Sequence, residues 1–481
     1  MGDQVKESTL NLKQIIITVL TAYIALVVCF YFLAGEQLRF RDSRGNVDFS
    51  PAETGTVELC RGVAVEQTML LKIQRLSSVS VQFGGYYREN RGTITMELWR
   101  GEEPLIRKSF DASAVQEGTI LTLNAGTPIE TACDVPLTLR ISADSEPGAA
   151  VTPLMNTSRE PEDGFSLFLN GEPSAGTLCF SAEGTDYIWT GLHYWQFAGV
   201  LGGLLVLLSF VVWHRFRTGR PSFIINVLTA MKKYRFLIRQ LVARDFKTKY
   251  KRSVLGIFWS FLNPLLLMLV QYFVFSAIFE SNIPNFAAYL IIGTVMFNFF
   301  SEACGMTLTS ILGNASLITK VYMPKYIYPL TRTLSSLVNL AISLIPMAVV
   351  CLVTGIHLAK SAVLALYFFA CLFVFSLGLG MLLATSMVFF RDTQFLWNVV
   401  NMMWMYATPI FYPETILSDR FRIILQVNPL YYFLKSIRMC LMDGISPEPV
   451  MYFRCLVIAL AMLLAGAAVF YKKQDKFVLY L

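Results

Sequence analysis

The chain has 481 residues, of which 55% are hydrophobic and 15% are charged, and its mean hydropathy is +0.53. These values exclude an ordinary soluble domain and predict a polytopic membrane protein with a polar insert. The net charge of +7 is unevenly divided, because residues 36–190 carry 13 Lys+Arg against 22 Asp+Glu. We therefore expect an acidic domain on one side of a membrane, basic loops on the other side, and no nucleic-acid partner.

The first predicted element is a membrane anchor. Residues 15–34 are an unbroken apolar run, long enough to cross a bilayer as a helix. Bulky residues at its end, Tyr31 to Leu33, do not suit signal peptidase, so we expect a retained anchor rather than a cleaved signal. Residues 1–35 are thus predicted to be a cytoplasmic N-terminus followed by this anchor.

Residues 36–190 change to short alternating strands separated by Gly, Asn, Asp and Pro. This pattern predicts an inserted all-β domain, a jelly-roll-like sandwich. Its candidate glycan-binding residues are Tyr86, Tyr87 and Trp99, whose rings can stack on sugars. The alternative is that these aromatic residues pack in the core or across strands.

The nine cysteines show no metal-ligand spacing, and we predict no metal site. Cys60, Cys133 and Cys179 lie in the insert, so at most one internal disulfide is possible there. Cys60 and Cys179 lie in the first and last strand-like runs, which often pair. They are the disulfide candidate.

A second transmembrane helix is predicted at residues 191–214, followed by a basic region at 215–253. Between Arg215 and Arg252 there are twelve Lys+Arg and one acid, Asp245. By the positive-inside rule this region is cytoplasmic, which makes residues 36–190 extracytoplasmic.

Within the basic region, residues 231–252 have the pattern of an amphipathic helix with one apolar stripe. We expect this helix to lie in the headgroup region of the cytoplasmic leaflet, in contact with membrane lipids. The cations assigned to this interface are Arg239, Arg244, Lys247, Lys249, Lys251 and Arg252.

Six more spans follow, which makes eight in all, with both termini cytoplasmic and a cytoplasmic tail at 476–481. They are predicted at residues 254–279, 285–305, 327–354, 361–388, 395–412 and 450–471. Residues 412–447 are too short and broken for a full return crossing. They are interpreted as re-entrant helices at the outer mouth of a pathway, or as an interfacial loop on the outer surface.

An ordered series of motifs runs through residues 235–475. It begins with RQLVARDFKTKYKRSVLG and continues through AAYLIIGTVMFNFF, SILGNASLITKVYMPKYIYPL, FFRDTQFLWNVVNMMWMYATPIFYP and QVNPLYYF. The series resembles the permease subunits of ABC transporters that export polysaccharides such as O-antigen, teichoic acid and capsule. The resemblance implies that residues 254–475 are a six-span permease domain in a multi-pass cell-membrane protein. The first 230 residues lie outside it.

The resemblance also implies partners. A cytoplasmic loop would couple to a separate ATP-binding subunit, which would hold the ATP and Mg, and two permease copies would form a homodimer. The matching loop residues are Asn314, Ser316, Leu317, Ile318, Lys320, Val321, Tyr322, Pro324 and Lys325. The sequence contains no GxxxxGK[ST], so we expect this chain itself to hold no cofactor and to be no enzyme.

The implied substrate is a lipid-linked polysaccharide, whose pyrophosphate the interface cations would attract. Aromatic and polar residues in the spans are candidates for the translocation path, although such aromatics more often face lipid. The candidates are Trp259, Asn298, Phe300, Glu302, Trp404, Tyr406 and Tyr412. An ionisable residue inside a span usually faces a cavity or a partner helix, so Glu302 and then Arg332 stand out.

Three other functions compete with glycan export. A related permease would export a small lipid or drug. A membrane-embedded glycosyltransferase or phosphotransferase would need paired acids or a histidine at one face, and His193, His214 and His357 are scattered. A receptor would need a cytoplasmic output domain, and the sequence shows none.

Overall fold

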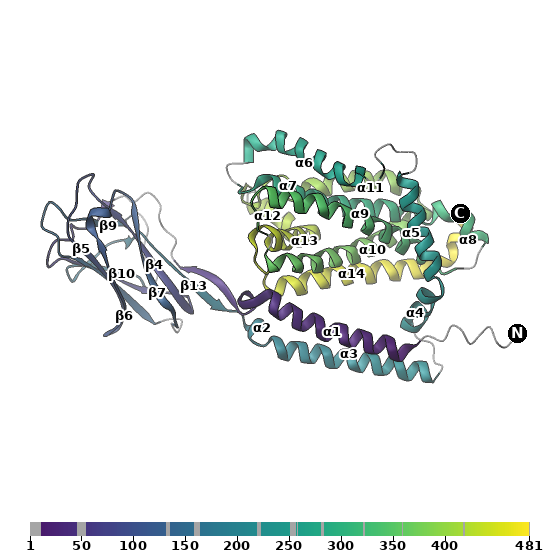
Figure 1. Cartoon of the computed structure of the whole chain (residues 1–481), viewed down its shortest axis with the longest axis horizontal. Helices are drawn as coiled ribbons and strands as arrows, with labels where there is room; N and C mark the ends of the chain where they lie inside the picture. Colours follow the sequence, from purple (N-terminus) through teal and green to yellow (C-terminus); the bar gives the residue numbers. More distant parts are fainter. Residues whose placement is uncertain are drawn as a thin grey trace. The chain divides into compact units, whose positions relative to one another are not determined.

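The computed structural model describes residues 11–45, 54–130, 135–157, 164–218, 223–250, 256, 258–279, 283–320, 323–357, 359–416 and 419–480. The chain forms two compact units (Figure 1). One comprises Arg39–Leu192, against the predicted domain at 36–190, and the other comprises Met1–Leu38 with His193–Leu481. The fold class is confirmed: a polytopic helical membrane protein carries an inserted all-β domain.

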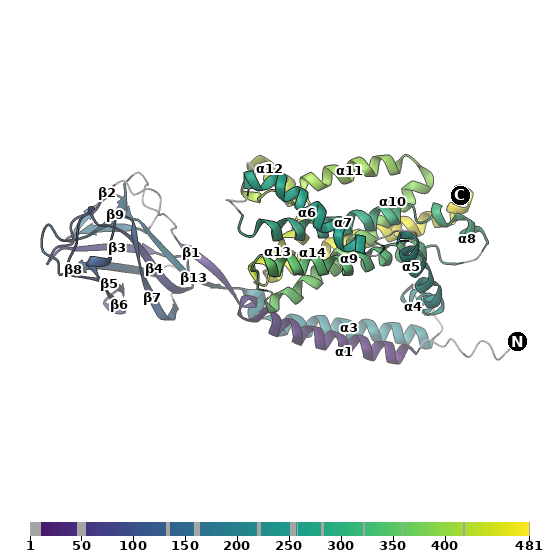
Figure 2. The same ribbon diagram turned by 45° about the horizontal axis from the view of Figure 1, so that its top comes forward.

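The β unit consists of two antiparallel sheets (Figure 2). In one sheet the strand order is β1-β13-β4-β9-β12, with β2 on β9 and β7 on β4, and in the other it is β11-β10-β3-β8-β5-β6. The strands are β1 Phe40–Gly45, β2 Thr54–Gly55, β3 Ala64–Leu70, β4 Arg75–Gly84, β5 Thr93–Arg100, β6 Glu103–Asp111, β7 Thr119–Glu130, β8 Pro136–Ala143, β9 Thr152–Asn156, β10 Ser166–Leu169, β11 Glu172–Ser174, β12 Thr177–Leu178 and β13 Phe180–Tyr187.

Alternation of side chains builds the core between these sheets. In β3 every second residue is buried, and β4 sends Val79, Val81 and Phe83 inward with no exposed surface. The first strand pairs along its whole length with residues 182–187 of the last strand, and Phe40 lies opposite Tyr187. The unit therefore begins and ends at one place.

The predicted disulfide between Cys60 and Cys179 is not formed. Cys60 is a free thiol that donates to Glu58 at 3.9 Å, and its backbone bridges to Ser145. The backbone of Cys179 instead bonds to Leu154 in β9 and to Gln82 in β4, two strands of the same sheet. The prediction failed because it placed Cys60 in the first strand. Cys60 lies just before β3, whereas the strand that pairs with the last one is β1. Cys133 lies outside the described residues.

Two long helices, α1 Leu12–Ala34 and α3 Tyr194–Arg217, lie side by side in the helical unit (Figures 1 and 2). The Tyr23 hydroxyl donates to the Ala198 carbonyl at 2.6 Å, and Tyr194 donates to Val27 at 2.7 Å. Each tyrosine thus binds the backbone of the other helix, as polar groups do within a membrane.

Most of the remaining helices form a bundle in the helical unit, where α7 and α14 both pack against α10. Apart from short turns, they are α2 Trp189–Leu192 in the β unit, α4 Phe223–Lys233, α5 Arg235–Tyr250, α6 Phe258–Phe279, α7 Phe286–Leu308, α8 Ala315–Lys320, α9 Ile327–Val353, α10 Ala365–Phe389, α11 Thr393–Ala407, α12 Asp419–Val427, α13 Pro429–Arg438, α14 Pro449–Lys473 and α15 Phe477–Tyr480. Glycines at 378 and 466 let α10 and α14 touch backbone to backbone.

Seven helices within the described residues are long and apolar enough to cross a membrane, against the eight predicted. The difference is the predicted span 395–412, which corresponds to α11. This helix has 15 residues and a length of about 22 Å, short of a hydrocarbon core of about 30 Å. Backbone at Thr408 turns extended before Pro409, and α12 lies at the far end of α11 (Figure 2). The predicted span is therefore a short helix, α11, followed by extended backbone at Thr408.

Candidate functional site around Asp245

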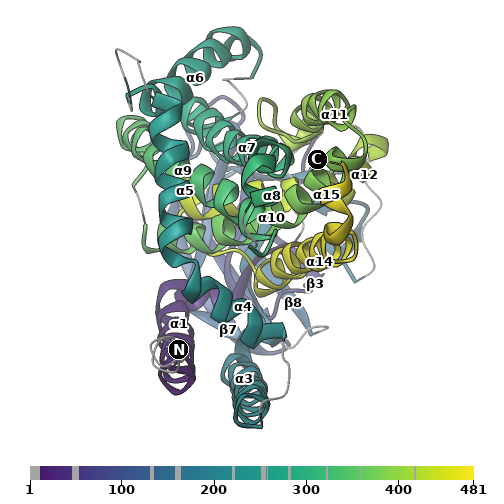
Figure 3. The same ribbon diagram turned by 90° about the vertical axis from the view of Figure 1, so that its right-hand side faces the viewer.

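The predicted amphipathic helix is two helices, α4 and α5, separated at Tyr234. Helix α5 crosses the end of the bundle in contact with α9 (Figure 3). Its apolar stripe faces protein there: Leu241 is buried, and Leu237 and Ile238 pack on the cluster that contains Tyr328. The expectation that this stripe faces lipid is therefore wrong for these residues.

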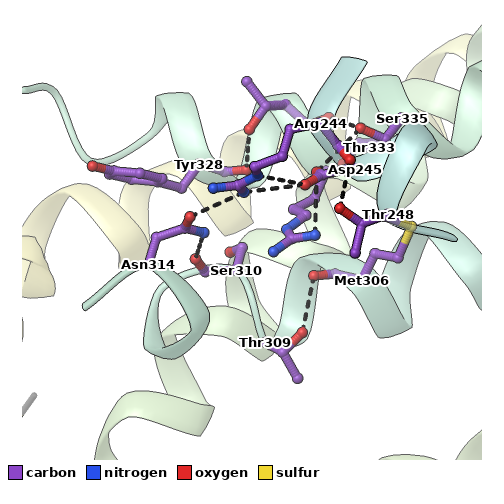
Figure 4. A network of polar contacts seen from close by, with 12 residues as sticks. Arg244, Asp245, Thr248, Met306, Thr309, Ser310, Asn314, Tyr328, Thr333 and Ser335 are labelled. Atoms are coloured by element: carbon purple, nitrogen blue, oxygen red, sulfur yellow. Dashed lines mark hydrogen bonds and ion pairs between the residues drawn. The ribbon is translucent and has the colours of Figure 1, made fainter. Parts of the chain in front are cut away.

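At the centre of this contact lies Asp245, whose side chain is only 4% exposed. Its carboxylate accepts from Arg244 Nη2 and from Arg332 Nη1, both at 3.1 Å, and from Ser335 Oγ at 3.3 Å (Figure 4). A buried carboxylate costs several kcal/mol unless it is paired, and two guanidinium groups provide that pairing. Sequence reasoning assigned Asp245 no role, although it is the single acid among twelve cations.

Arg244 extends the network to a second segment. Its Nη2 donates to Asn314 Oδ1 at 3.2 Å, and Asn314 Nδ2 donates to the Ser310 carbonyl at 2.8 Å (Figure 4). Asn314 is buried and directly precedes α8. One arginine therefore joins α5, the start of the predicted coupling loop and, through Asp245, helix α9.

A second ion pair lies in the same cleft. Lys249 Nζ is 2.6 Å from Glu302 Oε1, and Asn339 Nδ2 donates to the same oxygen at 2.7 Å. Both networks line a cleft of about 580 Å³, whose walls are Arg244, Asp245, Phe246, Thr248, Lys249, Glu302, Met306, Gly313, Arg332, Ser335 and Asn339. It holds three cations and two carboxylates, so its formal charge is positive.

The cleft contains only some of the predicted interface cations. Arg244 and Lys249 line it, with side chains about half exposed. Arg239 and Lys247 are exposed and outside it. Lys251 and Arg252 lie outside the described residues.

The predicted coupling loop contains the short helix α8. Leu317 and Ile318 are half-buried against the cluster around Tyr328, so they are less exposed than expected, whereas Ser316 and Lys320 face solvent. Lys325 Nζ donates to the Gln474 carbonyl at 2.6 Å and Pro324 is half-buried beside it. Val321 and Tyr322 lie outside the described residues.

Residues predicted for a translocation path do not line one path in a single chain. Phe300 is fully buried and packs against Phe375, Trp397 and Trp404, so its assignment to the path is wrong. Trp404 is half-buried and donates to Asn428. Of the remaining candidates, Glu302 lines the cleft, Asn298 and Tyr412 are half-buried, and Trp259 and Tyr406 are exposed.

The predicted re-entrant segment shows how non-helical backbone is satisfied in this unit. Asn428 precedes α13, accepts from Trp404 Nε1 at 2.8 Å, and donates to the Ala407 carbonyl at 3.1 Å and to Thr408 Oγ1 at 3.0 Å. One side-chain amide thus binds the end of α11 and, by accepting from the Leu430 backbone amide at 3.0 Å, the start of α13. Such groups must be satisfied internally where lipid replaces water.

Arg438 performs the same task from α13. It is 9% exposed and donates from Nη1 to the Pro409 carbonyl at 2.7 Å and from Nη2 to the Tyr289 and Ile410 carbonyls at 3.1 Å. Its guanidinium lies 3.3 Å from the centre of the Tyr289 ring. A Cβ at Gly293 would lie 2.9 Å from Arg438 Nη2, so glycine leaves space for the cation.

The predicted glycan site of the β unit is not assembled as expected. Tyr86 and Tyr87 lie before β5 begins at Thr93, while Trp99 lies near the other end of that strand. Six residues of strand separate Thr93 from Trp99 by about 20 Å. Trp99 also donates to Glu97 at 3.1 Å. The three aromatic residues therefore do not form one platform.

Comparison with known proteins identifies the class of the helical unit. Residues 237–442, from α5 to the turn after α13, match the ABC-2 type transporter family. The helical unit is thus similar to the membrane domains of ABC-2 type transporters, and with its seven long apolar helices the chain is a multi-pass membrane protein.

Particular relatives narrow this class. The O-antigen export system permease protein RfbA of Myxococcus xanthus is 29% identical over 255 residues, which cover 53% of this chain and 98% of that protein. A protein of the same name from Klebsiella pneumoniae is 28% identical over 245 residues, covering 50% of this chain and 93% of that protein. The chain is similar to these permeases over nearly their whole length, and about half of the chain lies outside the matched segments.

Proposed function

We propose that this chain is the permease subunit of an ATP-driven exporter that moves a lipid-linked polysaccharide out of the cytoplasm. The observation that carries the proposal is the match of the helical unit to nearly the whole length of O-antigen export permeases. In this proposal a second copy of the chain completes the path, and a separate subunit binds ATP and Mg.

The cleft around Asp245 supports binding of the lipid's pyrophosphate. It is positively charged, and Arg244 and Lys249 keep about half of their side-chain surface in contact with solvent. Charge-assisted bonds to phosphate are stronger than neutral ones, and arginine can form two at once. A pyrophosphate entering the cleft would compete with Asp245 and Glu302 for these two cations.

The same network supports coupling to the motor. Arg244 contacts both Asp245 and Asn314, which precedes the predicted coupling helix. A shift of α8 would change the partners of Arg244 and hence the charge available in the cleft. We therefore propose that substrate binding and docking of the ATPase both change the contacts of the Arg244 side chain.

The orientation follows from charge. The basic α4–α5 region is placed in the cytoplasm by the positive-inside rule, and both chain termini are assigned to that side. The β unit then lies outside the cell membrane, where it is proposed to bind the emerging glycan. The predicted re-entrant segment, residues 412–447, would lie at the outer mouth.

The proposal is tested in a strain that lacks this chain. We expect a lipid-linked glycan to accumulate inside the cells and to reach the exterior again when the chain is restored. The purified chain should bring an ATP-binding subunit with it. Unchanged glycan location in the depleted strain would contradict the proposal, and accumulation of a small lipid or drug instead would favour the alternative of small-molecule export.

A further inference from the structure

The loop between β4 and β5 holds two consecutive tyrosines in the left-handed backbone region. The φ angles are 55° at Tyr86 and 54° at Tyr87, and Tyr87 is 91% exposed. Side chains other than glycine avoid this region unless the surroundings impose it. The loop therefore presents an aromatic ring to solvent at a conformational cost.

Hydrogen bonds with polar side chains fix this loop. The Glu117 carboxylate accepts from the backbone amides of Gly85 at 3.0 Å and Tyr86 at 3.1 Å. Asn90, only 2% exposed, donates to the Gly85 carbonyl at 2.9 Å. Arg88 stacks on the Tyr86 ring at 4.8 Å and pairs with Glu58. The position of Tyr87 is thus set before any ligand arrives.

A cleft of about 510 Å³ begins two residues further along the chain. Its lining residues are Glu89, Arg91, Gly92, Asp144, Ser145, Glu146 and Ala149. The bond from Arg91 N to the Ala149 carbonyl, 2.9 Å long, joins its two walls. Consecutive Cα atoms are about 3.8 Å apart, so Tyr87 is within reach of a ligand in the cleft.

One wall contains a buried hydroxyl without a partner. Ser145 is 2% exposed, and its Oγ makes no hydrogen bond to any residue that the structure describes. A Cβ at Gly92 would lie 2.5 Å from this oxygen, so only glycine lets the wall pack this closely against the hydroxyl. Buried polar atoms in folded proteins are nearly always satisfied, which points to a ligand that supplies the missing partner.

The chemistry of the cleft indicates the class of ligand. Three carboxylates, one guanidinium and one hydroxyl accept and donate hydrogen bonds, as the hydroxyl groups of a sugar require. Across the described residues, no three His, Cys, Asp or Glu side chains are spaced to hold a metal ion. The formal charge of the cleft is negative, which disfavours uronates and phosphates.

We propose that this cleft, with Tyr87 beside it, binds a short segment of an uncharged polysaccharide. The inference rests on the proposed export function and narrows its cargo to a polymer with neutral stretches. The cleft volume falls in the range of about 300–1,000 Å³ typical of small-ligand sites, so it holds a few sugar rings at most.

The test is saturation-transfer NMR with the full-length chain in lipid nanodiscs. The probes are the neutral trisaccharides maltotriose, mannotriose and galactotriose, and the anionic trigalacturonate. We expect transfer to at least one neutral probe and none to trigalacturonate. Tyr87→Ala and Glu146→Gln should each reduce the signal at least fivefold, while Trp99→Phe, at the other end of β5, should leave it unchanged.

Three results would overturn the site: no transfer to any neutral probe, stronger transfer to trigalacturonate, or an equal loss in the Trp99 variant. Displacement of the neutral probe by Ca²⁺ would also overturn it, by assigning the carboxylates to a metal. A second experiment separates the two proposals: the depleted strain is supplied with the Tyr87→Ala chain, and its glycan export is measured. Export without saccharide binding removes the site alone, and absence of any accumulated glycan removes the export function.

Discussion

Two charged regions of the helical unit use arginine in opposite ways. Around Asp245, arginine and lysine pair with carboxylates in an open cleft, and Arg244 and Lys249 are about half exposed. At the other region, Arg438 is buried and binds three backbone carbonyls rather than a carboxylate. Exposed ion pairs are weak and exchange partners readily, whereas a buried cation bound to backbone does not. The first region is suited to binding, and the second to fixed geometry.

The largest effect on stability is expected from substitution of the buried Arg438. Replacing it by Met removes three charge-assisted hydrogen bonds to backbone carbonyls, and we expect a loss of stability of about 3–5 kcal/mol. The measurement is the thermal unfolding of the detergent-solubilised chain. Arg454→Met, which removes a cation from α14 that lies 4.8 Å from the Tyr432 ring, is the control and should change stability by about 1 kcal/mol or less. Equal effects of the two variants would contradict the role of Arg438.

Asp245→Asn should have the next largest effect. It leaves Arg244 and Arg332 without their shared anion, and we expect a loss of about 2–4 kcal/mol together with loss of glycan export. Asp392→Asn, at an exposed position before α11, is the control. A variant that folds normally and exports at the native rate would show that the network around Asp245 has no part in transport.

Lys249→Gln should separate binding from stability. Because the Lys249–Glu302 pair is partly exposed, its loss should change stability by about 1 kcal/mol or less. Export should nevertheless fall, since one of two accessible cations for the pyrophosphate is removed. Lys247→Gln on the same helix, outside the cleft, is the matched control. Comparable export by both variants would refute the assignment of the cleft.

The smallest effect concerns pH in the β unit. The hydrogen bond from Arg88 lowers the pKa of Glu58, so the folded state favours the ionised carboxylate. Its contribution is present above the unfolded pKa of about 4.3 and is lost as pH falls through the lower folded value. Hydrogen exchange of the β4–β5 loop in the full chain should therefore accelerate on acidification below about pH 4. Acceleration that is unchanged in Glu58→Gln would assign the effect to another group.

The sequence predicted the elements that depend on local pattern. Apolar runs located the long helices, and alternation located the β unit, because each signal is contained within one segment. The short α11 was missed, since the apolar pattern of residues 395–412 continues beyond the point where the backbone turns extended at Thr408. Hydropathy reports burial in lipid and does not report where a helix ends.

The site was predicted less well because it depends on contacts between distant segments. The cations on α5, Glu302 on α7 and Arg332 on α9 were each singled out, but nothing in the sequence placed them in one cleft. Asp245 looked like an exception in a basic loop and is the centre of the network. Phe300 and Trp404 were assigned to the translocation path for the same reason. Their spacing in the sequence does not show that their rings pack against each other.

Pairing of β1 with β13 has a consequence for the history of the molecule. Since the lobe departs and returns through adjacent strands, it can be exchanged for another lobe without rethreading the helices that carry it. The β unit can then be gained, lost or replaced as a single segment, while the helical unit is inherited unaltered.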